Sequence, residues 1–425
     1  MLEPRKRSSV SPIAIVLAAA ALAAVTVAFA VVAVLSFNVF RDVDRGSQRS
    51  ELKPVQLGGK ETTVFRWSRD ACESEDYPDA PARAFRDAGG TVHLIASHMI
   101  TRGMVGRSLG DVRHRCDVLM RSSFNPDPGQ FADGEWITSP YTTDGRHVIA
   151  LIHNEYHGFD HPGRCPYPRP TYTGGKPIPC WYNSVTFTSS NDGGRTFRQP
   201  ATAQRRLVAG IPYRYRPEDR PYGIFSPTNI VYDKSDGYYY TLVKADEFGL
   251  QEQGTCVMRT DRVDDPSSWR AWNGSDFNVR FVDPYRDDAA PENHVCTPVS
   301  HEEIQGMTDS LTYNTYFDKY LLLGVKGRYD PELRKQVLGI YYSLSDDLID
   351  WQPAKLVREV EFPWTWTCGD AEPVAYPSLL DPRSDSRNFE TTGQHAWMFF
   401  TRFHYRGCET TPNRDLVRIG VTFSK

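Results

Sequence analysis

Carboxylic acids stand at the ends of short apolar runs in several parts of this sequence. Asp79 precedes one such run, Glu155 lies near the end of ALIHNEY, and Glu247 follows YYYTLVKAD. Two carboxyl groups at one opening, one kept protonated and the other ionised, can perform general acid and base chemistry on a hydrolysable bond. We therefore take Asp79 as the candidate base or nucleophile and Glu155 or Glu247 as the candidate acid.

Further polar residues occur where an inner strand is expected to begin or its antiparallel neighbour to end. Both places lie on one face of a ring of sheets, so these side chains should converge. The candidate substrate-binding residues are Arg83, His98, His153, Asn229, Asp246, Glu372, Arg402 and His404. Arg83, Asn229 and Arg402 would hold hydroxyl groups or a carboxylate of the substrate. The alternative is structural: a turn bond for Asp79, ion pairs for the arginines, and solvation or neighbouring hydrogen bonds for His153 and Glu155.

The elements that must position these residues are short strands. Runs rich in Val, Ile, Tyr, Phe and Thr are broken by Gly, Asp, Asn and Pro, and no convincing amphipathic helix longer than a turn or two occurs. A weak repeat of about 60 to 85 residues contains a strand, an Asp-Gly-type turn, an aromatic-rich strand and a third strand. Its five copies are expected at residues 79–123, 137–197, 225–269, 310–351 and 376–423.

This repeat predicts an all-β fold, a five-bladed β-propeller. A ring of four-stranded sheets has to close, because an open edge strand invites aggregation. TTVFRW, at residues 62–67, is therefore expected to add a strand to the last blade. A β-sandwich with coincidental spacing is the alternative.

The segment SSNDGGRTF carries the pattern Ser-x-Asp-x-Gly-x-Thr-Phe. The pattern residues are Ser190, Asp192, Gly194, Thr196 and Phe197, and the segment resembles the Asp box of sialidases and related propellers. In such a turn Ser and Asp bond backbone N–H groups, Gly permits a positive φ, and Phe packs between sheets. The resemblance implies a structural hairpin remote from the active site, so we assign it no catalytic part.

SDDLIDW, at residues 345–351, resembles the Ser-x-Asp-Leu-x-x-Trp turn of five-bladed glycosidases of the arabinanase, β-xylosidase and invertase-like groups. Residues 79–97 look like the opening of their first blade, and the resemblance spans about 79–423 as a repeat pattern. It implies one carboxylate on each of the first two blades and a Glu on the third. Asp79 matches the first. The second blade departs from the pattern, because no Asp precedes Pro140 and Glu155 is the nearest replacement for the second carboxylate. In the third blade, Asp246 and Glu247 stand at the corresponding strand end.

The resemblance implies a glycoside hydrolase that acts on a poly- or oligosaccharide by carboxylate acid/base catalysis, and the N-terminal segment considered below implies that it is extracytoplasmic. A sialidase-like hydrolase is one alternative, with Arg83 and Arg402 as two of its three arginines. A non-catalytic propeller that binds carbohydrate or protein is the other. No Ser-His-Asp order, phosphate-binding loop, dinucleotide fingerprint or HExxH motif occurs in the sequence, so we expect neither a cofactor nor a metal.

The N-terminal part is expected to hold the domain at a membrane. Residues 12–37 carry no charge, a length sufficient for a transmembrane signal-anchor, and the basic residues of 1–11 favour a cytoplasmic N-terminus. A cleaved signal peptide, giving a secreted protein, is the alternative. Residues 38–60 are expected to form a tether and 61–425 the propeller, exposed in a periplasm or at the cell surface.

Charge and cysteine content narrow the partners further. A net charge of -4 without a long basic block argues against nucleic acid. The eight cysteines form an even set without metal-site spacing, as expected where thiols are oxidised. Sequence leaves the pairing open, although neighbours in order (72 with 116, 165 with 180, 256 with 296, 368 with 408) would each close a loop within or beside one blade.

Overall fold

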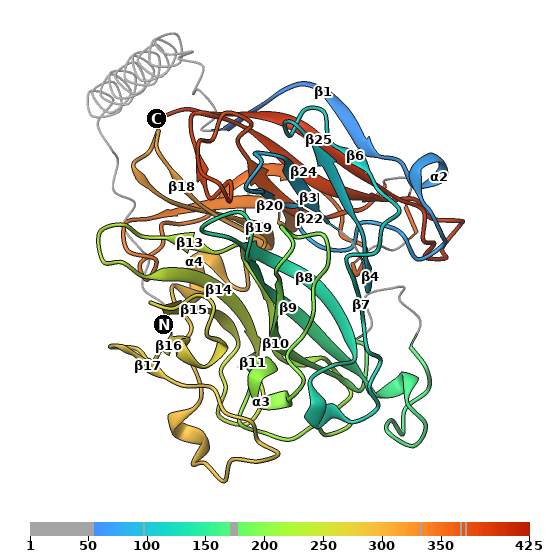
Figure 1. Ribbon diagram of the computed structural model, residues 1–425, viewed down its shortest axis with the longest axis vertical. Coiled ribbons are helices and arrows are strands. Elements are labelled where there is room, and N and C mark those ends of the chain that lie inside the picture. Colours follow the sequence, from blue (N-terminus) through green and yellow to red (C-terminus); the bar gives the residue numbers. More distant parts are fainter. Residues whose placement is uncertain (1–54, 97, 171–176, 332–333, 366–367, 370–371) are drawn as a thin grey trace, which may run out of the picture. The chain divides into compact units, whose positions relative to one another are not determined.

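The computed structural model describes residues 55–96, 98–170, 177–331, 334–365, 368–369 and 372–425. These residues form short β-strands and a few single-turn helices, in antiparallel units that follow one another along the chain (Figure 1). Blade 1 consists of β2 (Arg83–Arg86), β3 (Val92–Ile95), β5 (Gly103–Gly106) and β6 (Arg113–His114). Blade 2 consists of β8 (Gly134–Tyr141), β9 (Val148–His157), β10 (Trp181–Ser190) and β11 (Leu207–Ala209).

Blades 3, 4 and 5 are also built largely of antiparallel neighbouring strands. Blade 3 consists of β12 (Tyr222–Pro227), β13 (Val231–Tyr232), β14 (Tyr239–Asp246), β15 (Gly254–Thr260), β16 (Arg270–Trp272) and β17 (Phe277–Val279). Blade 4 consists of β18 (Ser310–Asn314), β19 (Lys319–Asp330), β20 (Lys335–Ser345) and β21 (Lys355–Glu359). Blade 5 consists of β22 (Val374–Leu380), β24 (His395–Phe403), β25 (Arg414–Phe423) and β1 (Val55–Phe65).

Short elements lie in the connections between these strands. Two small strands, β4 (Ile100–Thr101) and β7 (Met120–Arg121), pair with each other, and β23 (Thr391–Thr392) pairs with β18. The helices are α2 (Trp67–Asp70), α3 (Ala203–Arg206), α4 (His301–Ile304) and the 3-10 turns η1 (Pro128–Gln130), η2 (Gly158–Asp160), η3 (Pro266–Ser268) and η4 (Pro291–Asn293). The prediction that residues 117–123 form the third strand of blade 1 is wrong. These residues contain β7, which pairs with β4 outside blade 1.

The five units close into a ring. Their innermost strands contact one another in cyclic order: β2 with β8, β8 with β12, β13 with β18, β18 with β22, and β22 with β2. A buried apolar cluster lies between each pair of neighbouring blades, so the core is divided into wedges rather than one layer between two sheets. Burying each large apolar side chain contributes about 1.5–3 kcal/mol. This arrangement is a five-bladed β-propeller and not a sandwich.

The ring is closed by pairing the first described strand with the last. β1 runs antiparallel to β25, from the pair Val55↔Phe423 to Phe65↔Leu416, and the two lie side by side in blue and red in Figure 1. The predicted closing strand is confirmed as far as Phe65, and Trp67 begins α2 instead. β1 starts at Val55, inside the segment expected to be a tether.

The Asp-box turn has the structural part expected of it. The Asp192 carboxylate accepts hydrogen bonds from the Thr196 backbone N–H at 2.9 Å and the Thr196 hydroxyl at 2.7 Å. Although burial opposes it, hydrogen bonding from Ser190 and Thr196 lowers the pKa of Asp192 to about 2. Gly194 has φ +84°, and a Cβ there would lie 2.4 Å from the Phe85 ring. The glycine is therefore required both by the backbone and by the neighbouring blade.

Four disulfides join cysteines that are neighbours in sequence order, as the sequence analysis favoured. They are Cys72–Cys116, Cys165–Cys180, Cys256–Cys296 and Cys368–Cys408. Four such bonds indicate an extracytoplasmic protein.

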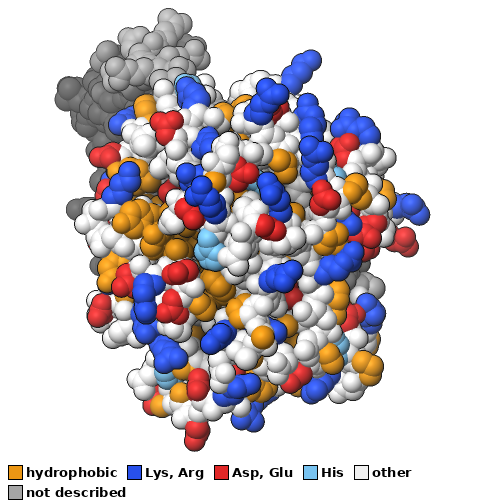
Figure 2. Space-filling model, viewed as in Figure 1, with side chains coloured by type: hydrophobic (Ala, Val, Ile, Leu, Met, Phe, Trp, Pro, Cys, Tyr) orange, Lys and Arg blue, Asp and Glu red, His pale blue; other side chains and the backbone are white. Residues whose placement is uncertain are grey.

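Within the described residues no helix is long and apolar enough to cross a bilayer. The anchor expected at residues 12–37 lies outside those residues. On the face drawn in Figure 2, acidic and basic side chains are interspersed rather than gathered into one basic stripe.

A buried carboxyl group in blade 2 makes stability depend on pH. Glu135 in β8 is fully buried, and this burial raises its pKa to about 7 from an ordinary 4.5, against hydrogen bonds from Gln199 and Ser123. The folded state favours the protonated form of Glu135. The stability that this group contributes is therefore fully present below about pH 4.5 and is lost as the pH rises through about 7, by about 3 kcal/mol at most. Urea unfolding measures the free energy of unfolding of Glu135→Gln minus that of wild type. This difference should therefore be more favourable to the variant at pH 8 than at pH 5. Glu359→Gln is the exposed control, and an equal Glu135→Gln difference at both pH values would contradict this prediction.

Candidate active site

Three blades meet at the carboxylate of Asp79. Its Oδ1 accepts hydrogen bonds from the Tyr376 hydroxyl at 3.1 Å and from Arg414 Nη1, and its Oδ2 accepts one from Trp136 Nε1 at 3.2 Å. Trp136 belongs to β8, Tyr376 to β22 and Arg414 to β25. His98 follows β3, and its Nε2 lies 3.6 Å from Asp79 Oδ2. We call Asp79, His98, Trp136, Tyr376 and Arg414 the Asp79 cluster.

An irregularity in β22 aims Tyr376 at this cluster. The pairing of β22 with β24 shifts register between Ala375 and Ser378, and Tyr376 has φ 58°, a left-handed conformation that a tyrosine rarely adopts. Bulges of this kind turn a side chain away from the regular alternation of the strand. Burial, and after it the charge of Asp79, raises the pKa of Tyr376 well above its ordinary value. The phenol therefore stays protonated and donates to Asp79.

Glu155 lies in the same electrostatic environment as Asp79. Its Oε2 is 2.9 Å from His157 Nε2 and its Oε1 is 3.4 Å from His153 Nδ1, and its side chain is 12% exposed. Both carboxylates act electrostatically on His98 and on Tyr376. The two carboxylates are connected through Trp136, which donates to Asp79 and whose ring centre lies 6.1 Å from that of His153, the neighbour of Glu155.

The histidines beside these carboxylates are mostly desolvated. Burial lowers the pKa of His98, although Asp79 opposes the shift, and burial likewise lowers the pKa of His153 against Glu155. Both imidazoles are therefore neutral at neutral pH. His98 also lies 3.0 Å from the Tyr77 hydroxyl through its Nε2.

Arg83 lies in the centre of the ring but has a structural set of partners. Its Nε donates to the Thr138 carbonyl at 2.8 Å and its Nη2 donates to the Asp309 carbonyl at 2.5 Å, so it links blades 1 and 2 to the start of blade 4. Burial lowers the pKa of Arg83 to about 9 and raises that of Asp309 to about 6, and the two groups interact electrostatically. This guanidinium has little capacity left for a substrate carboxylate.

Two of the other candidates also bond to the scaffold, and a third is solvent-exposed. Asn229 accepts from the Leu311 N–H at 2.9 Å and donates to its carbonyl at 2.5 Å, which fastens blade 3 to blade 4. Asp246 is ion-paired with Lys244 at 3.0 Å. Glu247 has a 64% exposed side chain and its cationic neighbour is Arg220 at 3.9 Å. Glu247 is thus a solvent-exposed side chain just after the end of β14.

The last three candidates form a separate surface network on blade 5. Glu372 lies 3.4 Å from Arg402 and 2.7 Å from His404, and Arg402 also pairs with Glu61. Phe403, the last residue of β24, packs against Arg414, with its ring centre 4.4 Å from the guanidinium carbon. Because side chains alternate along a strand, Arg402 faces the other side of the sheet. His404 follows the strand and lies 3.3 Å from Asp415.

Trp136 and Arg414 were not among the site residues predicted from the sequence. Trp136 carried a usable signal, since it stands near the start of an expected inner strand beside Glu135. Arg414 begins a third strand, where no polar convergence was expected. Only the packing of blade 5 against blade 1 brings Arg414 to Asp79.

A cavity of about 410 Å³ opens beside Glu155. It is lined by Met99, Phe124, Asp133, Gly134, His157, Asp160 and His161. His157 connects this space to the Glu155 carboxylate through the 2.9 Å contact. Phe124 is 51% exposed and offers an apolar ring surface of the kind on which sugar rings pack. The cavity is therefore a space near Glu155 in which a ligand could lie.

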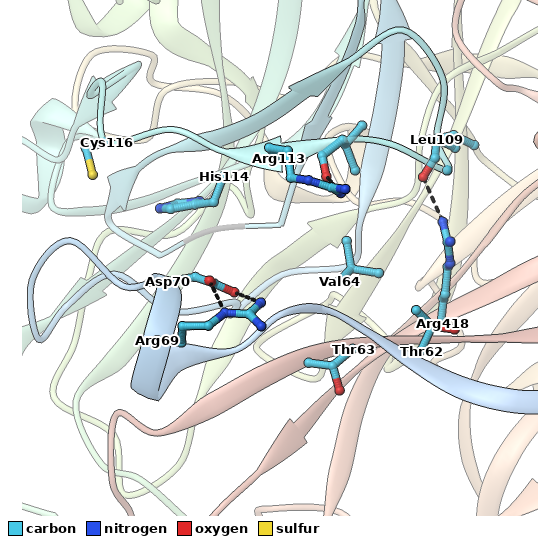
Figure 3. A pocket seen from close by; sticks show the side chains of 12 residues that line it. Thr62, Thr63, Val64, Arg69, Asp70, Leu109, Arg113, His114, Cys116 and Arg418 are labelled. Carbon is cyan, nitrogen blue, oxygen red and sulfur yellow. Dashed lines mark hydrogen bonds and ion pairs between the residues drawn. The ribbon is translucent and has the colours of Figure 1, made fainter.

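A second cavity, of about 600 Å³, lies at the seam between β1, β25 and the outer part of blade 1 (Figure 3). The carboxylate among its lining residues, Asp70, is bonded by Arg69 at 2.7 Å, while Arg418 donates to the Leu109 carbonyl at 2.8 Å (Figure 3). A bound carboxylate of this kind cannot act alone as both acid and base. We therefore place the candidate active site at the axial carboxylates and not at this seam.

One group of side chains has metal-ligand composition within the described residues. Cys72, Asp76 and His114 lie close together, but the Cys72 sulfur is bonded to Cys116 and His114 Nε2 lies 2.8 Å from Asp76. A disulfide sulfur is not a thiolate ligand, so this group does not have the donors of a metal centre.

No family model matches the chain, and no curated protein matches it. Among solved structures it is similar to an α-L-arabinanase from Cellvibrio cellulosa, with 10% identity, TM-score 0.43, and coverage of 80% of this chain and 91% of that one. It is also similar to the catalytic domain of a GH62 α-L-arabinofuranosidase from Coprinopsis cinerea, with 10% identity, TM-score 0.44, and coverage of 85% and 95%. A putative exo-β-1,3-galactanase from Bifidobacterium bifidum gives 11% identity, TM-score 0.42, and coverage of 83% and 94%.

Proposed function

We propose that this protein is an extracytoplasmic glycoside hydrolase that acts on a poly- or oligosaccharide through Asp79 and Glu155. The proposal is supported by the contacts that connect these two carboxylates: the Trp136 ring, which donates to Asp79, lies 6.1 Å from the His153 ring, and His153 Nδ1 lies 3.4 Å from Glu155. Glycoside hydrolysis requires two carboxyl groups across the bond to be cleaved, one as acid and the other as base or nucleophile.

The partners of each carboxylate suggest the division of labour. Asp79 receives donors on both oxygens, from Arg414, Tyr376 and Trp136, which is the environment of an ionised carboxylate. Such a group suits the base or nucleophile. Glu155 borders the cavity through His157 and suits the acid that protonates the leaving oxygen. In this proposal the sugar lies in the cavity against Phe124.

The proposal extends to how the protein is held. The uncharged residues 12–37 would anchor the N-terminus in a membrane, with the disulfide-bonded propeller outside. Fractionation of cells that express the full chain, followed by carbonate extraction of membranes, tests the anchor independently of activity.

The activity test uses the full chain in detergent, a panel of neutral and acidic polysaccharides, and dinitrophenyl glycosides, with products identified by mass spectrometry. Asp79→Asn is expected to lose at least about 10²-fold in kcat on both kinds of substrate, because a base or nucleophile is needed whatever the leaving group. The Tm of the variant is measured alongside to show that it folds. Wild-type activity in folded Asp79→Asn would remove Asp79 from the mechanism.

A non-catalytic carbohydrate-binding propeller is the second candidate, and one observation favours it. Asp79 already has three hydrogen-bond donors, as a purely structural carboxylate would. This function predicts capture on a glycan array with no product from any bound glycan. The sialidase-like alternative has less support, because Arg83 is bonded to carbonyl groups and Arg402 to Glu61, so neither guanidinium is free to hold a substrate carboxylate.

A further inference from the structure

A serine, an imidazole and an amide form a hydrogen-bonded chain beside Glu155. Ser226 Oγ lies 2.9 Å from His153 Nδ1, and His153 Nε2 lies 3.1 Å from Asn183 Oδ1. Their order along the chain is His, Asn, Ser, so a search of the sequence for a Ser-His-Asp order does not find them. They come from β9, β10 and β12.

The amide fixes which nitrogen of His153 carries the proton. Asn183 Nδ2 donates to the Tyr222 carbonyl at 3.0 Å, so its Oδ1 is the atom that faces the imidazole. An amide oxygen only accepts, so His153 is protonated at Nε2 and its Nδ1 presents a lone pair to the Ser226 hydroxyl. This is the relation of nucleophile, base and orienting group that activates a serine.

The surroundings suit a base that becomes charged only transiently. His153 is 7% exposed and neutral in the resting state, and the Glu155 Oε1 lies 3.4 Å from its Nδ1. When Nδ1 accepts a proton, this carboxylate stabilises the imidazolium. A lone structural His-Ser hydrogen bond would need no such carboxylate.

An irregularity in β12 turns Ser226 out of the regular ladder. The pairing with β14 passes from Ile224↔Ala245 to Pro227↔Val243, so Phe225 and Ser226 together oppose the single residue Lys244. Bulges next to active sites re-aim side chains in this way. The Lys244 ammonium lies 4.6 Å from the centre of the Phe225 ring and acts electrostatically on His153. A cation, ion-paired with Asp246 at 3.0 Å, is therefore present close to the bulge.

We propose that Ser226, His153 and Asn183 form an acyl-transfer site that hydrolyses small O-acyl esters. Ser226 Oγ bonds to the ester carbonyl carbon while its proton passes to His153 Nδ1. The carbon–oxygen bond to the alcohol then breaks, and the alcohol leaves with that proton. Water attacks the acyl-serine, its proton passes to His153, and the carboxylic acid is released as Ser226 recovers its proton.

The test uses the full chain in detergent with 4-nitrophenyl acetate and with a fluorophosphonate probe that labels activated serines. Wild type is expected to hydrolyse the ester and to carry the probe on Ser226, as mapped by peptide mass spectrometry. Ser226→Ala should lower ester hydrolysis by about 10²-fold or more and abolish the label, and His153→Gln should do the same. Ser235→Ala, a serine bonded only within an exposed turn, should match wild type.

Three results would overturn this inference: ester hydrolysis that survives in folded Ser226→Ala, a label on another residue, or wild type that neither reacts with the probe nor exceeds Ser226→Ala. The glycan assay runs on the same samples. Ser226 has no part in the carboxylate mechanism, so Ser226→Ala should still cleave any glycan that wild type cleaves. Failure of the acyl-transfer site and failure of the glycoside hydrolase proposal are thus read from different substrates.

Discussion

Glu155→Gln is expected to lower kcat on a polysaccharide substrate by about 10²–10⁴-fold, the usual contribution of a general acid. A sugar alkoxide is a poor leaving group and needs the proton that Glu155 would supply. Dinitrophenolate leaves without protonation, so the same variant should keep most of its activity on a dinitrophenyl glycoside. Gln is the same size and retains an oxygen for the His157 contact, which limits structural effects.

Glu247→Gln is the matched control for this experiment. Glu247 was the other candidate acid in the sequence, but its side chain is 64% exposed and its cationic neighbour is Arg220. Its variant should stay within about twofold of wild type on both substrates. An equal loss on both substrates in Glu155→Gln would argue against an acid role. A loss in Glu247→Gln alone would move the acid to blade 3.

Arg83→Leu is expected to destabilise the protein by about 2–4 kcal/mol, because two carbonyl oxygens lose a charged donor. The guanidinium is bonded to carbonyl groups of two other blades, and its loss leaves those oxygens unsatisfied and removes one of the two cations that act on the partly buried Asp309. Urea unfolding at pH 8 measures the change. Arg402→Leu, which breaks a partly exposed surface pair, should cost about 1 kcal/mol or less.

The pH dependence distinguishes a lost charge partner from a lost packing contact. Burial raises the pKa of Asp309 to about 6 from 3.8, so its protonated form is favoured in the fold and stability falls as the pH rises from about 4 through about 6. Without Arg83 the ionised form of Asp309 is opposed further, so the Arg83→Leu penalty should be larger at pH 8 than at pH 5. Adding Asp309→Asn should recover part of it at pH 8. A penalty independent of pH would mean that packing alone is lost.

The repeated units and the closing strand could be predicted because each leaves a local trace. A strand, a tight turn and an aromatic-rich strand recur in order, and the Asp-box residues specify one turn through bonds only a few residues long. Blade 1 was less readable, since β7 pairs with β4 and only the structure reveals that the strand-like run there leaves the sheet.

Residues of the candidate site could be predicted from the sequence only where they lie close to a recognisable strand of their own blade. Asp79 and Glu155 were recognisable in this way. The donors Trp136 and Arg414 were not, and Arg414 lies 335 residues away from Asp79 along the chain. Arg402 was predicted at the opening from its position near a strand end, but in the structure Phe403 is the neighbour that packs against Arg414.

The pairing of Cys72 with Cys116 joins the segment just after β1 and α2 to the segment just after β6. Because β1 belongs to blade 5 and β6 to blade 1, this disulfide joins the strand that closes the ring to the first blade. A single protease cut between the two cysteines would leave the pieces covalently attached. They should migrate together on a denaturing gel until a thiol reductant is added, and separate only then.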